Sequence, residues 1–160
     1  HAGFTNAIDA IAARVRGSDG MDSVGTAVRI GCLAPGVSPE TLARLSAALE
    51  AVTEEGRESS AWFQHARGLV AYRTGRFAEA LAFLSKAVEL ADDRPTSRRL
   101  FLALTCHALG RREEARAWLA KGMADRRPWS PGLIVMISPA ASEGTLEVLR
   151  REAEALIEPR

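Results

Sequence analysis

The sequence is poor in the residues that cross-link small proteins. Among its 160 residues there are only two cysteines, Cys32 and Cys106, and they form no C-x-x-C pair. Closely spaced cysteines are typical of zinc sites and disulfide frameworks, so the sequence predicts neither. We expect two reduced, buried thiols in a protein of the cytoplasm.

Long apolar runs are also missing. The most apolar run, Leu133 to Ile137, lies between Pro131 and Pro139 and is far shorter than the roughly 20 residues that a membrane helix needs. The sequence therefore predicts no membrane segment. Two readings of the run stay open: it fills the core, or it forms an exposed patch that mediates homodimerisation.

Neither sign of charge dominates. The chain has 21 Lys and Arg against 20 Asp and Glu, for a net charge of +1, so its overall field is too weak to attract nucleic acid or an anionic membrane. Its arginine pairs are interspersed with acidic residues and predict a mixed, solvated surface. These pairs are Arg98-Arg99, Arg111-Arg112, Arg126-Arg127 and Arg150-Arg151.

Recognisable catalytic patterns are absent from the sequence as well. It has no glycine-rich phosphate loop in a strand-loop-helix setting, so we expect no nucleotide cofactor. Cys106 and His107 are neighbours, but adjacent side chains on a helix do not face each other. A metal site built from His65, Cys106 and His107 would have no known ligand spacing. We therefore predict a protein that is not an enzyme and holds no cofactor or metal.

A repeat is the strongest positive signal in the sequence. The segment Gly75 to Ala80, GRFAEA, is echoed thirty-five residues later by Gly110 to Ala115, GRREEA. A helix is predicted before each glycine, over 60–73 and 96–109, and another after it, over 76–91 and 111–124. Glycine accepts left-handed backbone geometry without a Cβ clash, so Gly75 and Gly110 are predicted to turn the chain between two paired helices.

The second helices carry small and apolar residues at matching places along one face. These are Ala80, Leu84 and Ala87 in one copy and Ala115, Leu119 and Gly122 in the other. Small residues at such positions let two helices approach closely. The sequence thus predicts two helical hairpins that are copies of each other.

A third, degenerate hairpin is predicted upstream. Leu42, Leu45, Leu49 and Val52 precede Phe77, Ala80, Leu84 and Ala87 by the same thirty-five residues. Ser38 as N-cap and Pro39 in the first turn predict where its second helix begins. Its first helix is expected over 22–33, before the breaker Ala34-Pro35-Gly36.

Helices are also predicted at both ends of the array, because a terminal repeat exposes an apolar face. One covers 5–16, and the other is capped by Ser142 and carries Leu146, Leu149, Ala153 and Leu156. We expect residues 1–20 to hold a tag remnant and the N-terminal helix. Residues 21–127 form the repeats (21–55 degenerate, 59–91 and 95–124), and 128–160 form a loop and a capping helix.

At these positions the chain resembles the tetratricopeptide repeat family. The family's small residue in the first helix corresponds to Gly68 and Ala103, its hairpin alanine to Ala80 and Ala115, and its later small residue to Ala87 and Gly122. The customary tryptophan falls instead on Gln64 and Arg99, and the closing proline comes late, at Pro95. Residues 61–120 are similar to repeat regions of large bacterial serine/threonine kinases and WD40 proteins.

The resemblance implies an all-α superhelix of hairpins that acts as a scaffold and receives a protein or peptide partner in a concave groove. The groove lacks the lysine and asparagine set of chaperone-binding members, so a partner segment with apolar anchors and an acidic residue fits better. Trp62 and Tyr72 are either anchors for the partner or part of the core. The groove residues that the resemblance implies are Trp62, His65, Leu69, Tyr72, Arg73, Ser97, Leu100, Leu104, His107 and Ala108. The alternative function is structural self-association as a homodimer.

Overall fold

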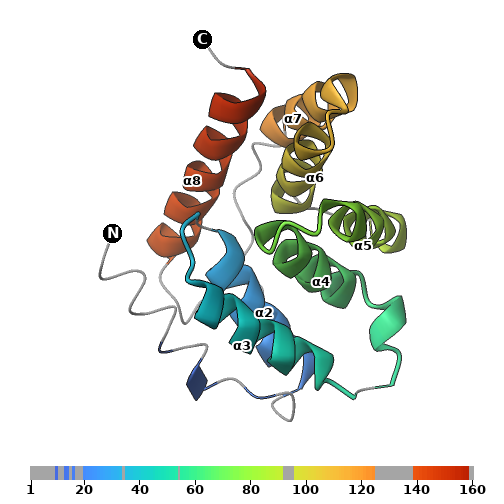
Figure 1. Cartoon of the computed structure of the whole chain (residues 1–160), viewed down its shortest axis with the longest axis vertical. Helices are drawn as coiled ribbons and strands as arrows, with labels where there is room; N and C mark the ends of the chain where they lie inside the picture. Colours follow the sequence, from blue (N-terminus) through green and yellow to red (C-terminus); the bar gives the residue numbers. More distant parts are fainter. Residues whose placement is uncertain are drawn as a thin grey trace. The chain divides into compact units, whose positions relative to one another are not determined.

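The structure is a computed structural model that describes residues 10, 13–14, 16, 20–33, 35–53, 55–91, 96–124 and 139–158 (Figure 1). All regular elements in these ranges are helices, which confirms the all-α fold class. They are α2 (Met21–Leu33), α3 (Pro39–Glu50), the 3-10 helix η2 (Arg57–Ser59), α4 (Ala61–Arg73), α5 (Phe77–Leu90), α6 (Thr96–Ala108), α7 (Arg112–Ala124) and α8 (Pro139–Ile157).

The chain divides into two compact units, His1–Arg94 and Pro95–Arg160. In the first unit α2 packs against α3 and α4, α3 also contacts α4, and α4 pairs with α5. In the second unit α6 pairs with α7, and α8 contacts both of them. The boundary between the two units lies between the α4–α5 hairpin and the α6–α7 hairpin. It falls inside the range 21–127, which the sequence predicts to be one array of repeats.

The two paired-helix turns are built alike. Gly75 and Gly110 have φ of 77° and 76°, in the left-handed region that glycine favours. The N–H of the residue after each glycine donates a hydrogen bond to a carbonyl of the preceding helix. Arg76 donates to Ala71, and Arg111 donates to Cys106, both at 2.8 Å. These hydrogen bonds satisfy carbonyls that the end of a helix leaves open. The predicted turn role of both glycines is confirmed.

Helix starts follow the local signals in two places. The Ser38 hydroxyl accepts a hydrogen bond from the Thr41 N–H at 3.1 Å, and Pro39 occupies the first helical position, as predicted. Ser60 caps α4 in the same way, through the Phe63 N–H.

Close approach between the paired helices depends on small residues, as the sequence predicts. An added Cβ at Gly68 of α4 would lie 2.5 Å from Cγ of Leu84 in α5, and one at Gly122 of α7 would lie 3.0 Å from a methyl carbon of Leu100 in α6. Within each hairpin the matching residues of the second helix are buried. These are Ala80, Leu84 and Ala87, and Ala115, Leu119 and Gly122.

One prediction about the C-terminal region is wrong. Helix α8 begins at Pro139, so Ser142 lies inside the helix and is not its N-cap. Proline is well suited to a helix start, because its missing N–H would have no partner in the first turn anyway. The run Leu133 to Ile137 lies outside the described residues. Of the predicted helix over 5–16, the described residues Ala10, Ala13 and Arg14 are helical, and the described Arg16 is not.

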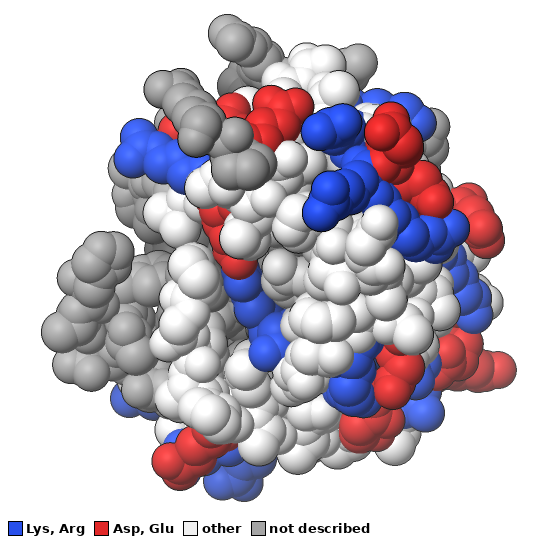
Figure 2. Space-filling view, turned by 45° about the horizontal axis from the view of Figure 1, so that its top comes forward, with Lys and Arg blue, Asp and Glu red and all other residues white. Residues whose placement is uncertain are grey.

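Within the described residues, no helix is long and apolar enough to cross a membrane. Charges of both signs lie side by side on the face shown in Figure 2. Two arginines of the predicted pairs form ion pairs with nearby glutamates. Arg111 Nε, just before α7, lies 2.8 Å from Glu114 Oε1, and Arg151 Nε lies 3.1 Å from Glu147 Oε1 within α8.

Candidate functional site

Trp62, at the start of α4, lies against α2. An added Cβ at Gly25 would lie 2.6 Å from the indole nitrogen of Trp62, so the absence of a side chain there lets the ring approach the α2 backbone. The guanidinium of Arg29, one turn further along α2, lies 4.6 Å from the ring centroid. A cation over the face of a tryptophan is attracted by the ring's quadrupole. Trp62 is therefore held by α2 while part of its surface stays accessible.

Arg73, at the other end of α4, also contacts α2. Its Nε donates a hydrogen bond of 2.8 Å to the carbonyl oxygen of Cys32, in the last turn of α2. Such a bond supplies a donor to a helix end whose last carbonyls have no partner within the helix. The Arg73 guanidinium lies 5.3 Å from the ring centroid of Tyr72, and that ring lies 5.6 Å from Phe77. Both Tyr72 and Arg73 are half-buried.

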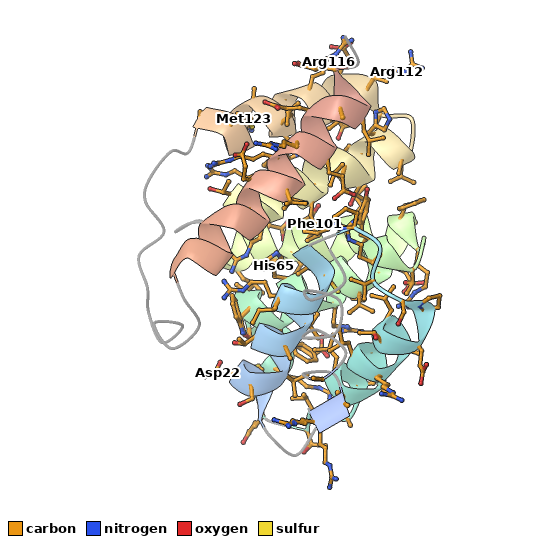
Figure 3. All side chains as sticks on the ribbon, turned by 90° about the vertical axis from the view of Figure 1, so that its left-hand side faces the viewer. Asp22, His65, Phe101, Arg112, Arg116 and Met123 are labelled. Carbon is orange, nitrogen blue, oxygen red and sulfur yellow. The ribbon has the colours of Figure 1, made fainter. Side chains whose placement is uncertain are left out.

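Four of the implied groove residues are buried. His65, labelled in Figure 3, is 2% exposed in the first unit. Its ring centroid lies 6.3 Å from that of Trp62. Leu69 is fully buried, and so is Leu100, which contacts Gly122 of its hairpin partner. Leu104 is 1% exposed. These four side chains belong to the core and line no accessible surface.

The remaining implied residues keep some exposure. In the first unit these are Trp62, Tyr72 and Arg73, all of α4. In the second unit, Ser97 and His107 are half-buried, and Ala108 at the end of α6 is exposed. In the described structure, Trp62 and Arg73 of α4 contact α2. Of the predicted α4 residues, some lie at the surface and others lie in the core.

Sequence reasoning missed the contribution of α2. Gly25 and Arg29 lie more than thirty residues before Trp62, and no local pattern connects them to it. It also missed a stack around Arg67, whose guanidinium lies 4.1 Å from the ring of Phe83 and 5.8 Å from that of Phe63. The sequence contained one signal for this position. Phe83 and Trp118 are thirty-five residues apart, so both second helices carry an aromatic residue at the same place in the repeat.

The two thiols are not activated as nucleophiles. Burial raises the pKa of Cys32 to about 12, with a smaller opposing effect from Arg73. Burial also raises the pKa of Cys106, and the nearby Glu114 carboxylate raises it further. The thiolate is the reactive form of cysteine, so both side chains are unreactive at neutral pH.

No group of three or more His, Cys, Asp or Glu side chains that could hold a metal ion occurs in the part of the chain that the structure describes.

Comparison with protein families decides what the hairpins are. Residues 61–94 match a family model described as a tetratricopeptide repeat, and residues 97–121 match a second one. Both hairpins are thus similar to tetratricopeptide repeats. The first matched range contains α4 and α5, and the second contains α6 from its second residue and most of α7. No curated protein and no solved structure matches the chain.

The matches indicate a coarse function. Tetratricopeptide repeats are non-catalytic modules that generally mediate protein–protein interaction. The α2–α3 hairpin lies before the matched ranges, but it packs against α4 through both of its helices, as a preceding repeat would.

Proposed function

We propose that this chain is a non-enzymatic scaffold module that binds a peptide or partner segment on the face of its first helices, in the cytoplasm. The observation that carries the proposal is the pair of matched tetratricopeptide repeats. We further propose that the module is part of a larger bacterial signalling protein.

Three half-buried residues of α4 are the proposed contacts in the first unit: Trp62, Tyr72 and Arg73. The ring of Trp62 is already fixed by Gly25 and Arg29, so binding would cost it little conformational entropy. Aromatic and arginine side chains supply most of the binding energy in many interfaces. A partner segment with an apolar side chain near an acidic one would suit these contacts. In the second unit, His107 is the proposed contact.

The test is affinity capture of the partner with wild-type module and with the Trp62→Ala/Tyr72→Ala variant. Circular dichroism first establishes that the variant stays folded, because Trp62 also packs on α2. The matched control is Trp118→Ala, which removes a half-buried aromatic from α7, a second helix. We expect the double variant to lose the partner and the control to keep it.

Equal capture by the folded double variant and the wild type would refute the proposed contacts. Capture of the module by itself, with a doubled mass in light scattering, would instead favour the alternative function, self-association. The run Leu133 to Ile137 would then be the first segment to substitute.

A further inference from the structure

The three proposed contacts on α4 are all held, directly or through one neighbour, by α2. Trp62 and Arg73 contact α2 themselves, and the Arg73 guanidinium in turn lies 5.3 Å from the ring centroid of Tyr72. Helix α2 comes before both ranges that match tetratricopeptide repeats. A hairpin outside the matched ranges therefore contacts both ends of the helix that carries the proposed contacts.

The two helices run parallel, so their corresponding ends lie together. Gly25, in the first half of α2, lies beside Trp62 at the start of α4. The Cys32 carbonyl, in the last turn of α2, accepts the hydrogen bond from Arg73 at the end of α4. At about 100° per residue, Trp62 and Arg73 are only about 20° apart around α4, and Gly25 and Cys32 are about 20° apart around α2. One side of α2 thus faces one side of α4.

The missing side chain at Gly25 makes room for the Trp62 ring. An added Cβ there would lie 2.6 Å from Nε1, 2.9 Å from Cδ1 and 3.4 Å from Cε2 of the indole, which are all atoms of its five-membered ring. Favourable contact between such atoms needs about 3.5 Å or more. A side chain at position 25 would therefore push the ring away from α2. Because the ring is the far end of a side chain, it can move without displacing either helix.

Arg29 holds the same ring by a different interaction. Its guanidinium lies 4.6 Å from the indole centroid, within the distance at which a cation is attracted to an aromatic face. Position 29 is one helical turn after Gly25, on the same side of α2. The space at Gly25 and the cation of Arg29 together favour one orientation of Trp62.

We propose that Gly25 and Arg29 are positioning residues for partner recognition, which makes the α2–α3 hairpin a part of the binding module. The role rests on the proposed function, because it requires that Trp62 contacts the partner. Both residues act through Trp62 rather than on the partner itself. A ring that is already oriented loses less conformational entropy when the partner binds.

The first test measures Trp62 itself in the full chain. Trp118 and Trp129 are replaced by phenylalanine, so that Trp62 is the only tryptophan. Gly25→Ala should raise the acrylamide quenching constant of Trp62 and speed its anisotropy decay, because the displaced ring gains exposure and nanosecond motion. The urea midpoint should stay close to that of the parent chain. Alanine is a better helix former than glycine, and movement of the ring relieves the clash.

Variants of Arg29 and a control glycine separate positioning from general stability. Arg29→Met removes the cation and should also raise the quenching constant, whereas Arg29→Lys keeps a cation and should restore most of the parent value. Gly36→Ala is the control, because φ of 84° strains a residue with a Cβ while no atom lies within 4 Å of the added carbon. It should lower the urea midpoint and leave Trp62 quenching unchanged.

The second test follows partner binding to the immobilised full chain. The probe is the set of proteins that the wild-type chain captures and the Trp62→Ala/Tyr72→Ala variant loses, quantified by mass spectrometry. Gly25→Ala and Arg29→Met should each reduce capture of this set by about fivefold or more, as for an interface residue that contributes to binding. Arg29→Lys and Gly36→Ala should retain most of it.

Three results would overturn the positioning role. One is a Gly25→Ala chain in which Trp62 quenching and anisotropy match the parent chain. Another is a displaced ring with undiminished capture, which removes the positioning role and leaves the proposed contacts standing. The third is loss of capture by Arg29→Met with unchanged Trp62 quenching, since Arg29 would then contact the partner itself.

Failure of the proposed function gives a separate result. The Trp62→Ala/Tyr72→Ala variant then captures the same proteins as the wild type, and the role of Gly25 and Arg29 in partner recognition is overturned with it.

Discussion

Replacing Gly68 by alanine should destabilise the first unit, although the same change in an exposed helix stabilises it. Alanine is favoured over glycine in a helix interior by about 1 kcal/mol. Here the new Cβ would lie 2.5 Å from Cγ and 2.7 Å from Cδ2 of Leu84, and 3.4 Å from the Leu84 backbone nitrogen. Cγ is the branch point of the leucine, so rotating its end away gives no full relief.

The magnitude follows from two opposing contributions. Forcing an extra carbon into a packed seam costs about 1 to 3 kcal/mol, which exceeds or equals the gain in helix propensity. We expect Gly68→Ala to lower the free energy of unfolding by about 1 kcal/mol. Urea unfolding is measured through Trp62 fluorescence, with Trp118 and Trp129 replaced by phenylalanine, so that the signal reports the first unit.

A double-mutant cycle isolates the clash from every other effect. Leu84→Ala removes the atoms that the new Cβ would meet, at a cost of about 2 to 5 kcal/mol for the lost core contacts. In the Leu84→Ala background, Gly68→Ala should become neutral or stabilising by up to about 1 kcal/mol. If Gly68→Ala already stabilised the wild-type chain, the close approach of α4 and α5 would be wrong.

Three further predictions concern the turn, the α2 contact and the buried thiol. Gly75→Ala should cost about 1 to 2 kcal/mol in urea unfolding, because φ of 77° strains a residue with a Cβ, and an unchanged midpoint would contradict the turn geometry. Arg73→Met should cost about 1 to 2 kcal/mol by leaving the Cys32 carbonyl without its donor, whereas Arg44→Met, at an exposed ion pair, should change stability by less than about 0.5 kcal/mol. Since burial raises the Cys32 pKa from 9.0 to about 12, the unfolded chain loses this proton first, so stability should fall as pH rises above 9.0. A Cys32→Ala variant should lose that part of the pH dependence in unfolding experiments, and a wild-type stability that rises over this range would contradict the burial.

The hairpins and their turns were predictable because their signals are local. Each glycine turn is closed by hydrogen bonds between residues no more than five apart in the sequence. The bond from the Arg76 N–H to the Ala71 carbonyl is an example. The same holds for the Ser38 cap, three residues from its donor. The start of α8 was missed because two local signals competed, and the proline at Pro139 prevailed over the serine three residues later.

The candidate site was only partly predictable. A first helix in such an array packs against several neighbours, so its apolar face does not say which residues stay accessible. Helical spacing placed His65, Leu69 and Trp62 on one face of α4. Only packing against other helices separates the buried His65 and Leu69 from the half-exposed Trp62.

The sequence by itself determined the all-α class, the thirty-five-residue period, the turns at Gly75 and Gly110 and the small residues between paired helices. Each of these depends on backbone geometry or on side-chain size at short range. Tertiary structure alone decided that Arg73 reaches the end of α2, forty-one residues upstream, and that His65 and Leu69 are buried while Trp62 is half-buried. The physical reason is that solvent exposure and capping partners depend on which helices are neighbours in space. The distance between two residues along the sequence does not show which helices pack together.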